Sequence, residues 1–245
     1  MFSIFKAKPK LTSFIQPGQT DIHSHLLFGL DDGAKTPQDT LDLARKFVAA
    51  GYTHCIATPH VMNTVWENTA SGILERLEET RKLLVENQVP LRINAAAEYL
   101  MDTGFLELAR TKQLLPLKEN KVLVEMSYIN PPMNLFEILF EMQLAGYVPV
   151  LAHPERYGFY NNAIAEYEKL KNAGCLFQVN LLSAMGYYGS SAAKTADTLL
   201  GMGLIDYVGT DMHHLNHAQG LEARSVIRNN AALELALEKS REFSF

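Results

Sequence analysis

The sequence predicts an α/β fold, a single-domain barrel built from seven strand–helix units. Two observations predict it. Short apolar runs alternate with longer helical stretches along nearly the whole chain. These runs are too apolar to face water, which indicates a parallel sheet covered by helices. The length agrees, because 245 residues with 47% hydrophobic content suit one α/β barrel domain.

The chain is expected to begin with a loosely held lead-in, residues 1–18. Pro17 and Gly18 end it with a turn signal. The barrel domain is predicted over residues 19–245. Its strands are predicted where apolar runs lie between turn residues. They cover residues 20–24, 54–58, 91–97, 121–126, 147–152, 175–180 and 206–210.

Helices are predicted between the strands. The first covers 36–50, with Thr36 as N-cap, Pro37 at the first helical position and Gly51 at its end. The others are expected at 67–87, 102–111, 133–145, 162–173, 190–202 and 219–239. An open doubly wound sheet is the alternative. The barrel is favoured because no glycine-rich phosphate loop follows the first strand.

Composition narrows the class of protein. A net charge of −5 without a basic stripe argues against a nucleic-acid surface. Cys55 and Cys175 lie in apolar runs, which predicts buried free thiols. No stretch approaches the roughly 18 apolar residues that span a membrane. Residues 1–10 do not resemble an export signal. A cytoplasmic protein is therefore expected.

Metal-type side chains recur where the predicted strands end. His23 and His25 are two residues apart, so on an extended segment they point to the same side. Barrel enzymes place reacting residues at the carboxyl ends of their strands. Six of the seven predicted strands have such a residue there or just beyond. The candidate ligands are His23, His25, Asp32, His60, Glu98, Glu125, His153, Asp211 and His213.

Each of these side chains alone could be structural. Together, without cations, they would leave like charges and unpaired polar groups facing one another in one cavity. Imidazole and carboxylate donors without thiolate suit Mn²⁺, Zn²⁺ or Fe, with Mg²⁺ as a further alternative. Nine donors exceed the four to six or so that one ion needs, so two or three divalent ions are predicted.

Arg156 follows the fifth strand in the run H-P-E-R-Y. A guanidinium fork at the mouth of a barrel matches phosphate oxygens in geometry and charge. The alternative is a structural ion pair with Glu125 or Glu155. Arginine beside a metal cluster predicts phosphate-ester hydrolysis, with water activated by the ions and Arg156 as a catalytic, substrate-binding residue.

The motifs D-I-H-S-H, L-D-D-G, A-T-P-H, A-E-Y, L-V-E-M, A-H-P-E-R-Y and G-T-D-M-H resemble the polymerase-and-histidinol-phosphatase (PHP) superfamily, from about residue 21 to 214. Within it the chain is most similar to the bacterial manganese-dependent protein-tyrosine phosphatases of capsule and exopolysaccharide loci. The resemblance implies a distorted seven-stranded TIM-like barrel and a three-metal cluster. It also implies a substrate, phosphotyrosine on the tail of a partner bacterial tyrosine kinase.

The resemblance also implies a division of ligands. His23 and His25 would hold one ion with Glu98 and Asp211. Glu98 would bridge to a second ion, held with Glu125 and His153. The third would lie among Asp32, His60 and His213. Relatives commonly carry a second arginine several residues after the D-x-H pair, and here Ala218 stands near that place. His214, His217 or Arg224 are the candidates to replace it.

The substrate rim is less defined. Phe28, Tyr99 and Tyr128 could flank an aromatic substrate or form ordinary packing. His214 is a candidate substrate-binding residue, and His214 or His217 is the candidate general acid. Two other functions stay open: a small-molecule phosphatase of the histidinol-phosphate type, and a metal-binding regulatory subunit without catalysis. An amidohydrolase is disfavoured, because Glu125 stands where that class carries lysine.

Overall fold

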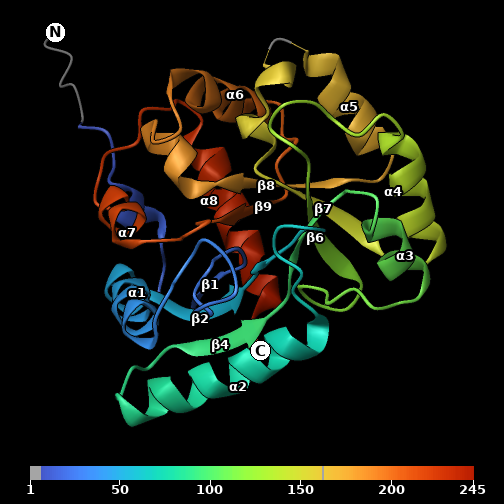
Figure 1. Ribbon diagram of the computed structural model, residues 1–245. Helices are drawn as coiled ribbons and strands as arrows, with labels where there is room; N and C mark the ends of the chain where they lie inside the picture. Colours follow the sequence, from blue (N-terminus) through green and yellow to red (C-terminus); the bar gives the residue numbers. More distant parts are fainter. Residues whose placement is uncertain (1–6, 162) are drawn as a thin grey trace, which may run out of the picture.

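The computed structural model describes residues 7–161 and 163–245. Within them short parallel strands form the centre and helices surround them (Figure 1). The strands are β1 Gln19–Asp21, β2 Tyr52–Ala57, β3 His60–Val61, β4 Arg92–Ala95, β5 Glu98–Leu100, β6 Lys121–Glu125, β7 Val148–Ala152, β8 Leu176–Asn180 and β9 Tyr207–Gly209.

The strands pair in the orders β1-β2-β4 and β3-β5-β6-β7-β8-β9. β3 continues β2 after a break at Thr58-Pro59, and β5 continues β4 after Ala96-Ala97. Backbone hydrogen bonds still cross the breaks, with Ala96 N donating to Ala57 O at 2.9 Å and Glu98 N to Pro59 O at 3.1 Å. The predicted seven strand positions are therefore present, two of them interrupted.

The ring closes between the segment after β1 and the segment after β9. Asp211 N donates to His23 O at 2.8 Å, and His25 N donates to Met212 O at 2.9 Å. Below them the buried Asp21 carboxylate accepts from Thr210 N at 2.8 Å and Thr210 Oγ1 at 3.0 Å. A side-chain bridge and a few backbone bonds replace a regular ladder, so the barrel is distorted, as the resemblance implied.

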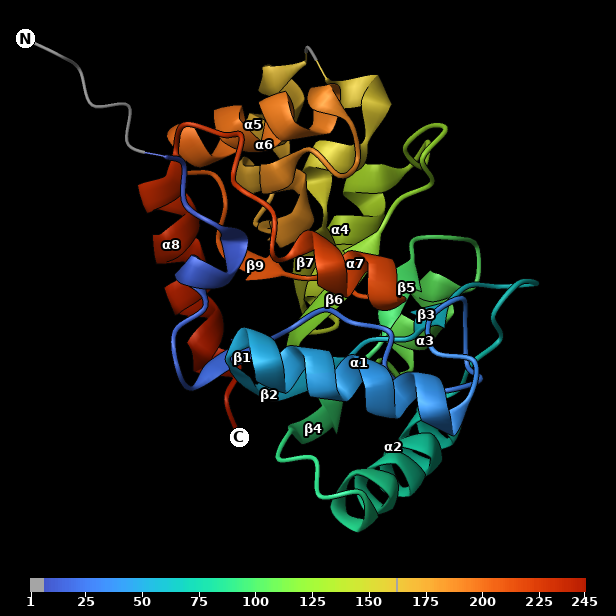
Figure 2. The ribbon, with the colours of Figure 1, turned by 90° about the vertical axis from the view of Figure 1, so that its left-hand side faces the viewer.

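The helices lie outside the strands (Figures 1 and 2). Their bounds are α1 Pro37–Ala50, α2 Ala70–Glu86, α3 Phe105–Arg110, α4 Leu135–Leu144, α5 Ile164–Asn172, α6 Ser190–Gly201, α7 Leu215–Gly220 and α8 Asn230–Lys239. α1 begins as predicted, because Thr36 and Asp39 form a reciprocal capping box with Pro37 next to the cap. The other predicted helices up to α6 shift by three residues or fewer at each end.

The single helix expected at 219–239 is wrong, because residues 221–229 separate α7 from α8. From Ser225 on, several backbone N–H groups there donate to distant acceptors instead of the preceding turn. Ser225 N donates to Pro9 O at 2.9 Å, and Val226 N to Ala184 O at 2.7 Å. Asn229 N donates to the Asp197 carboxylate at 2.8 Å. These tertiary acceptors outweigh local helix propensity.

The lead-in is held more closely than expected. Lys10 forms an antiparallel bridge with Arg224, and Leu11 N donates to Ala223 O at 3.0 Å. Leu11 and Phe14 are buried in the main apolar core. The loose attachment predicted for this part of the chain is therefore wrong from residue 10 onward, while residues 1–6 lie outside the described part.

A second, smaller apolar cluster includes Ile56 of β2, Leu123 of β6, Val150 of β7 and Tyr207 of β9. Strands this far apart around the ring can meet only across its interior, so this cluster fills the barrel. Cys55 and Cys175 are buried and free, as predicted. Among the described residues no helix is long and apolar enough to cross a membrane. The cytoplasmic location stays a prediction.

Candidate metal centre

A cavity of about 410 Å³ opens at the carboxyl ends of the strands. Six of the nine predicted ligands line it, and the other three lie fully buried close to them. Those in the wall are Asp32, His60, Glu125, His153, Asp211 and His213. The buried three are His23, His25 and Glu98. Residues from opposite ends of the sequence therefore meet in one place.

One group combines His23, His25, Glu98 and Asp211, whose donor atoms lie within 4.8 Å of one another. His23 Nε2 is 3.1 Å from Glu98 Oε2 and 3.3 Å from Asp211 Oδ1. His25 Nε2 is 3.5 Å and 3.4 Å from the same two oxygens. This is the set that the resemblance assigned to the first ion.

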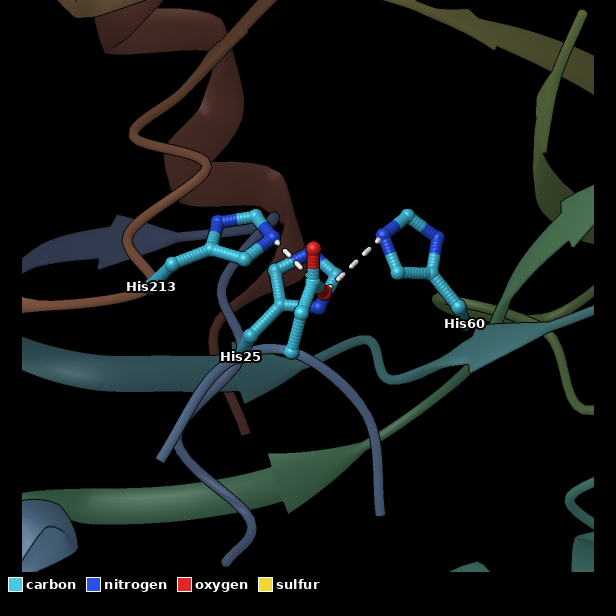
Figure 3. A group of neighbouring side chains, drawn as sticks. His25, His60 and His213 are labelled. Carbon is cyan, nitrogen blue, oxygen red and sulfur yellow. Dashed lines mark ion pairs between the residues drawn. The ribbon is translucent and has the colours of Figure 1, made fainter. Parts of the chain in front are cut away.

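A second group combines His25, Asp32, His60 and His213. Figure 3 shows the three histidines turned toward one another from separate parts of the chain: after β1, on β3 and after β9. Asp32 Oδ1 lies 3.4 Å from His213 Nε2 and 3.6 Å from His60 Nε2. His25 joins the three residues expected here.

A third group combines His60, Glu98 and Glu125. His60 Nδ1 is 3.2 Å from Glu98 Oε2 and 3.0 Å from Glu125 Oε1. The other Glu98 oxygen, Oε1, is 3.0 Å from His153 Nε2. Glu98 thus lies between groups, as a bridging carboxylate would. A neutral imidazole has one lone pair for a cation, so His60 can serve the second or the third group, but not both at once.

These donors fit divalent cations. His153 Nδ1 is buried without a hydrogen-bond partner among the described residues, and His60 Nδ1 and Glu125 Oε1 are close to each other but form no hydrogen bond. The Nε2 atoms of His23 and His25 face each other at 3.4 Å. Buried polar atoms left unpaired cost about 1–3 kcal/mol each. Cations held by imidazole and carboxylate would satisfy such atoms.

Partners behind the cluster fix the imidazole tautomers. His23 Nδ1 meets Gln178 Oε1 at 2.7 Å, His25 Nδ1 meets Asp31 Oδ2 at 2.6 Å, and His213 Nδ1 meets the Asp211 carbonyl at 2.9 Å. In each case Nδ1 donates, which turns Nε2 toward the group, and once Nε2 has lost its proton its lone pair can bind a cation there. Sequence reasoning missed Gln178 and Asp31 in this role. The sequence did offer a signal for each: Gln178 lies near the end of a strand, and Asp31 is next to the predicted ligand Asp32.

Charge balance within the cluster depends on these contacts. Burial disfavours ionised Glu98 and Asp211, but neighbouring imidazoliums hold the pKa of each carboxyl well below its usual range. Burial likewise opposes protonation of His23, yet Glu98 and Asp211 outweigh it and raise its pKa to about 9. Protons on imidazoles therefore balance the carboxylates when no other cation is present.

Two of the six non-glycine residues with positive φ in the described part of the chain lie at the same place. His153, directly after β7, has φ 36°, and Asp211, shortly after β9, has φ 53°. A non-glycine residue in the left-handed region costs about 1–3 kcal/mol and persists where the surroundings enforce it. Both residues carry side chains into the cluster, so the strain accompanies functional positions.

Arg156 lies in the short 3₁₀ helix that follows His153. Its Nη1 donates to Asp211 Oδ2 at 2.6 Å, so neither Glu125 nor Glu155 is its ion-pair partner. The guanidinium lies between two aromatic rings, 4.8 Å from the centroid of Tyr128 and 4.2 Å from that of Tyr188. Rings on both sides hold the fork at the cavity edge.

The predicted rim residues divide. Tyr128 lines the cavity and stacks on His153 with ring centroids 5.7 Å apart. Tyr99 does not line it, because it follows Glu98 on β5 and alternation turns its side chain to the other face. There it is buried, and its hydroxyl accepts from Leu115 N at 2.7 Å.

Phe28 lies away from the cavity wall, with its ring centroid 4.2 Å from the guanidinium carbon of Arg76. Trp66, which was not predicted, stacks on His60 at 4.9 Å.

The candidates to replace the second arginine also divide. His214 lines a neighbouring cavity of about 420 Å³ with Asp32, Lys35 and His213. His217 is buried. Arg224 donates to the Lys8 carbonyl in the lead-in. Of the three, His214 is the one beside the cluster in a cavity wall.

Comparison with known proteins adds independent findings. The family model "Capsular polysaccharide synthesis, CpsB/CapC" matches residues 19–228. Tyrosine-protein phosphatase YwqE of Bacillus subtilis is 30% identical over 220 residues, 88% of this chain and 86% of that protein. Tyrosine-protein phosphatase CpsB of Streptococcus pneumoniae is 28% identical over 202 residues, 80% of this chain and 83% of that protein.

Comparison with solved structures finds the same relatives. A crystal structure described as one of the metal-dependent tyrosine phosphatases YwqE and CpsB superposes with a TM-score of 0.77 at 29% identity, covering 82% of this chain and 84% of its own. Histidinol phosphate phosphatase from Lactococcus lactis superposes with a TM-score of 0.54 at 13% identity, covering 94% and 95%. The second likeness concerns the fold alone.

Proposed function

The chain belongs to the CpsB/CapC family of capsular polysaccharide synthesis, and from that premise we propose that it is a metal-dependent protein-tyrosine phosphatase. Its relatives YwqE and CpsB are named tyrosine-protein phosphatases, and the structural relative is described as metal-dependent. The observation that carries the proposal is one cavity beside Arg156 that six imidazole and carboxylate side chains line, with three more buried directly behind them.

The donor set supports two or three divalent ions, with Mn²⁺ as the ion we assign. One ion would be held by His23, His25, Glu98 and Asp211. A second would be held by Glu98, Glu125 and His153, and a third by Asp32, His60 and His213. Hard carboxylate oxygens mixed with imidazole and no thiolate favour Mn²⁺ over softer ions. Such ions, when bound, supply the acidity that makes water nucleophilic near neutral pH.

Arg156 and Tyr128 bind the substrate. Arg156 uses one N–H on Asp211, which leaves donors of the fork for the non-bridging oxygens of the phosphoryl group. Tyr128 lines the cavity beside Arg156 and His153 and is 47% exposed, so it offers aromatic surface for the ring of phosphotyrosine. Together these contacts orient the ester at the mouth of the cluster.

The leaving group of the proposed reaction needs little help from a general acid. Tyrosine departs as a phenolate whose free pKa is about 10, far below that of an alkyl alcohol. A proton donor is therefore helpful and not essential. His214 is our candidate, since it borders Asp32 and His213 in the adjoining cavity.

The partner is a phosphotyrosine-bearing tail of a bacterial tyrosine kinase, and the role is control of capsule or exopolysaccharide synthesis. The family description supports the role. The cavity supports an exposed, extended substrate segment, because its mouth is formed by residues on two projecting loops, Trp66 before α2 and Ile129 before α4.

Hydrolysis of a phosphotyrosyl peptide by the purified protein tests this function. Chelation should abolish turnover and Mn²⁺ should restore it. His60→Ala should be inactive with Mn²⁺ present. His54→Ala, a matched substitution at the start of β2 and outside the cluster, should remain active. Preference for histidinol phosphate over the peptide would replace the proposed substrate, and turnover unaffected by chelation would refute metal dependence.

A further inference from the structure

Five large apolar side chains lie exposed along α4 and the loop before it; we call them the α4 stripe. Their exposed fractions are 85% for Ile129, 104% for Met133, 45% for Phe136, 58% for Phe140 and 67% for Leu144. Single exposed apolar residues are ordinary, but five large ones on one helix and the loop leading into it indicate an interaction surface.

Helix periodicity places three members of the stripe on one face of α4. Phe136, Phe140 and Leu144 are four residues apart, so they lie one above the other along α4. The opposite face is already buried in the core through Ile138, Leu139 and Met142 among others. A helix that is apolar on both faces is normally covered on both. The stripe is the uncovered side.

The stripe is continuous with the metal cavity. Ile129, its first member, lines the cavity together with Tyr128, which stacks on His153. Figure 2 shows the yellow-green segment between β6 and α4 reaching outward from the strands. A molecule seated on the stripe therefore reaches the mouth of the site.

Charge indicates what kind of molecule fits. Residues 127–144 contain no Lys or Arg, and their charged residues are Glu137 and Glu141. Glu137 is exposed beside the stripe, whereas Glu141 pairs with Arg110 at 3.1 Å. A second copy placed on this face by a two-fold axis would bring the same acids toward each other. An occupant with apolar side chains and basic neighbours avoids that repulsion.

We propose that the α4 stripe is the docking surface for the phosphotyrosyl protein substrate. The occupant is a segment next to the phosphotyrosine that carries apolar side chains flanked by Lys or Arg. The inference rests on the proposed function and adds the chemistry that selects a protein substrate over free phosphotyrosine. α4 is about 15 Å long, so about five extended or ten helical residues of the substrate cover it.

Two synthetic peptides of matched length test the proposal. Each carries one phosphotyrosine at its centre and about twelve residues on either side, enough to cover α4 in either direction. One is flanked by alternating Leu and Lys, the other by Gly and Ser. The protein variants are Phe136→Ser with Phe140→Ser, and a control, Val85→Ser with Leu235→Ser, which removes two apolar side chains exposed on α2 and α8.

We expect the Leu/Lys peptide to have a KM about tenfold lower than the Gly/Ser peptide, as a few well-packed apolar anchors provide. Phe136→Ser with Phe140→Ser should erase this difference, and the control variant should keep it. Turnover of p-nitrophenyl phosphate should be the same in all three proteins. Anisotropy of the labelled peptides should give the same order of affinities without requiring turnover.

The proposal would be overturned if the wild-type protein bound both peptides with equal affinity. It would also be overturned if the stripe variant lost as much turnover of p-nitrophenyl phosphate as of the Leu/Lys peptide. A wild-type dimer that the stripe variant converts to a monomer would overturn it as well. If no aryl phosphate is hydrolysed by any of the proteins, the proposed function fails. The anisotropy measurement then still decides whether the stripe binds an apolar, basic segment.

Discussion

The metal cavity buries titratable side chains, whereas the outer face of α4 exposes large apolar ones. In the cavity, titratable groups such as His23 and Glu98 are fully buried. On α4, large apolar groups such as Phe140 and Leu144 face solvent. Burial of charge and exposure of apolar surface both cost free energy in an isolated chain.

The comparison teaches that each region is built for something outside the chain. Buried imidazoles and carboxylates are satisfied by cations, whereas exposed apolar side chains are satisfied by another apolar surface. The two regions meet at Tyr128 and Ile129, which line the cavity where the α4 stripe begins. The cluster provides the reaction and the stripe provides the choice of substrate.

The largest expected effect comes from the buried region. Glu98→Gln keeps the size of the side chain and removes the charge between the groups. Removal of one electrostatic stabiliser costs about 10²–10³-fold, and Glu98 contacts His23, His60 and His153. We therefore expect kcat/KM for a phosphotyrosyl peptide to fall at least about 10³-fold. The affinity of the peptide for the α4 stripe, measured by anisotropy, should be the same as in the wild-type protein. Near-normal turnover by Glu98→Gln would show that Glu98 is only structural.

Arg156→Lys should have the next largest effect. Lysine keeps the positive charge but loses the planar fork and its position between Tyr128 and Tyr188. We expect kcat/KM to fall about 10²-fold, with the number of bound ions unchanged. Steady-state kinetics measures kcat/KM, and metal analysis of the same preparation measures the number of bound ions. Loss of metal together with activity would mean that the Arg156–Asp211 ion pair serves the cluster instead of the substrate.

Asp31→Asn removes a charge behind the cluster. Asp31 accepts from His25 Nδ1 at 2.6 Å and from His60 N at 3.0 Å, so it orients two ligands without facing the cavity itself. Loss of such a partner lowers metal affinity about 10–100-fold. Titration of activity with Mn²⁺ should show this shift, with near-normal turnover at saturating metal. An unchanged titration would contradict the orienting role.

The smallest expected effect is the pH dependence of metal binding. The pKa of His23 is raised to about 9 without an ion, so this imidazole carries a proton at neutral pH that a metal must displace. Affinity should therefore rise with pH, by about tenfold per unit for one displaced proton. Calorimetry in buffers of different ionisation enthalpy measures the released protons. Affinity independent of pH between about 6 and 8 would contradict this charge balance.

Much of the site could be predicted because its residues follow a regular rule. His23 and His25 are two apart on an extended segment, and His60, Glu98, Glu125 and His153 each stand at or beside a strand end. The parallel arrangement brings such positions together at one edge. The same rule excludes Tyr99, whose odd step from Glu98 turns it into the core.

The rest depends on contacts that no local pattern contains. The break between α7 and α8 follows from acceptors far along the chain, such as Pro9 and Asp197. Of the two adjacent aspartates, only the fold decides that Asp31 orients His25 while Asp32 faces His60 and His213. The exposed side of α4 is indistinguishable in sequence from a core-facing one.

The number of divalent ions bound per chain tests the central claim most directly. After reconstitution with Mn²⁺ and removal of free metal, inductively coupled plasma mass spectrometry should find two or three ions in the wild-type protein and fewer in Glu98→Gln. A chain that retains no ion, or the same number with and without the Glu98 carboxylate, would contradict the view that these side chains share a metal cluster.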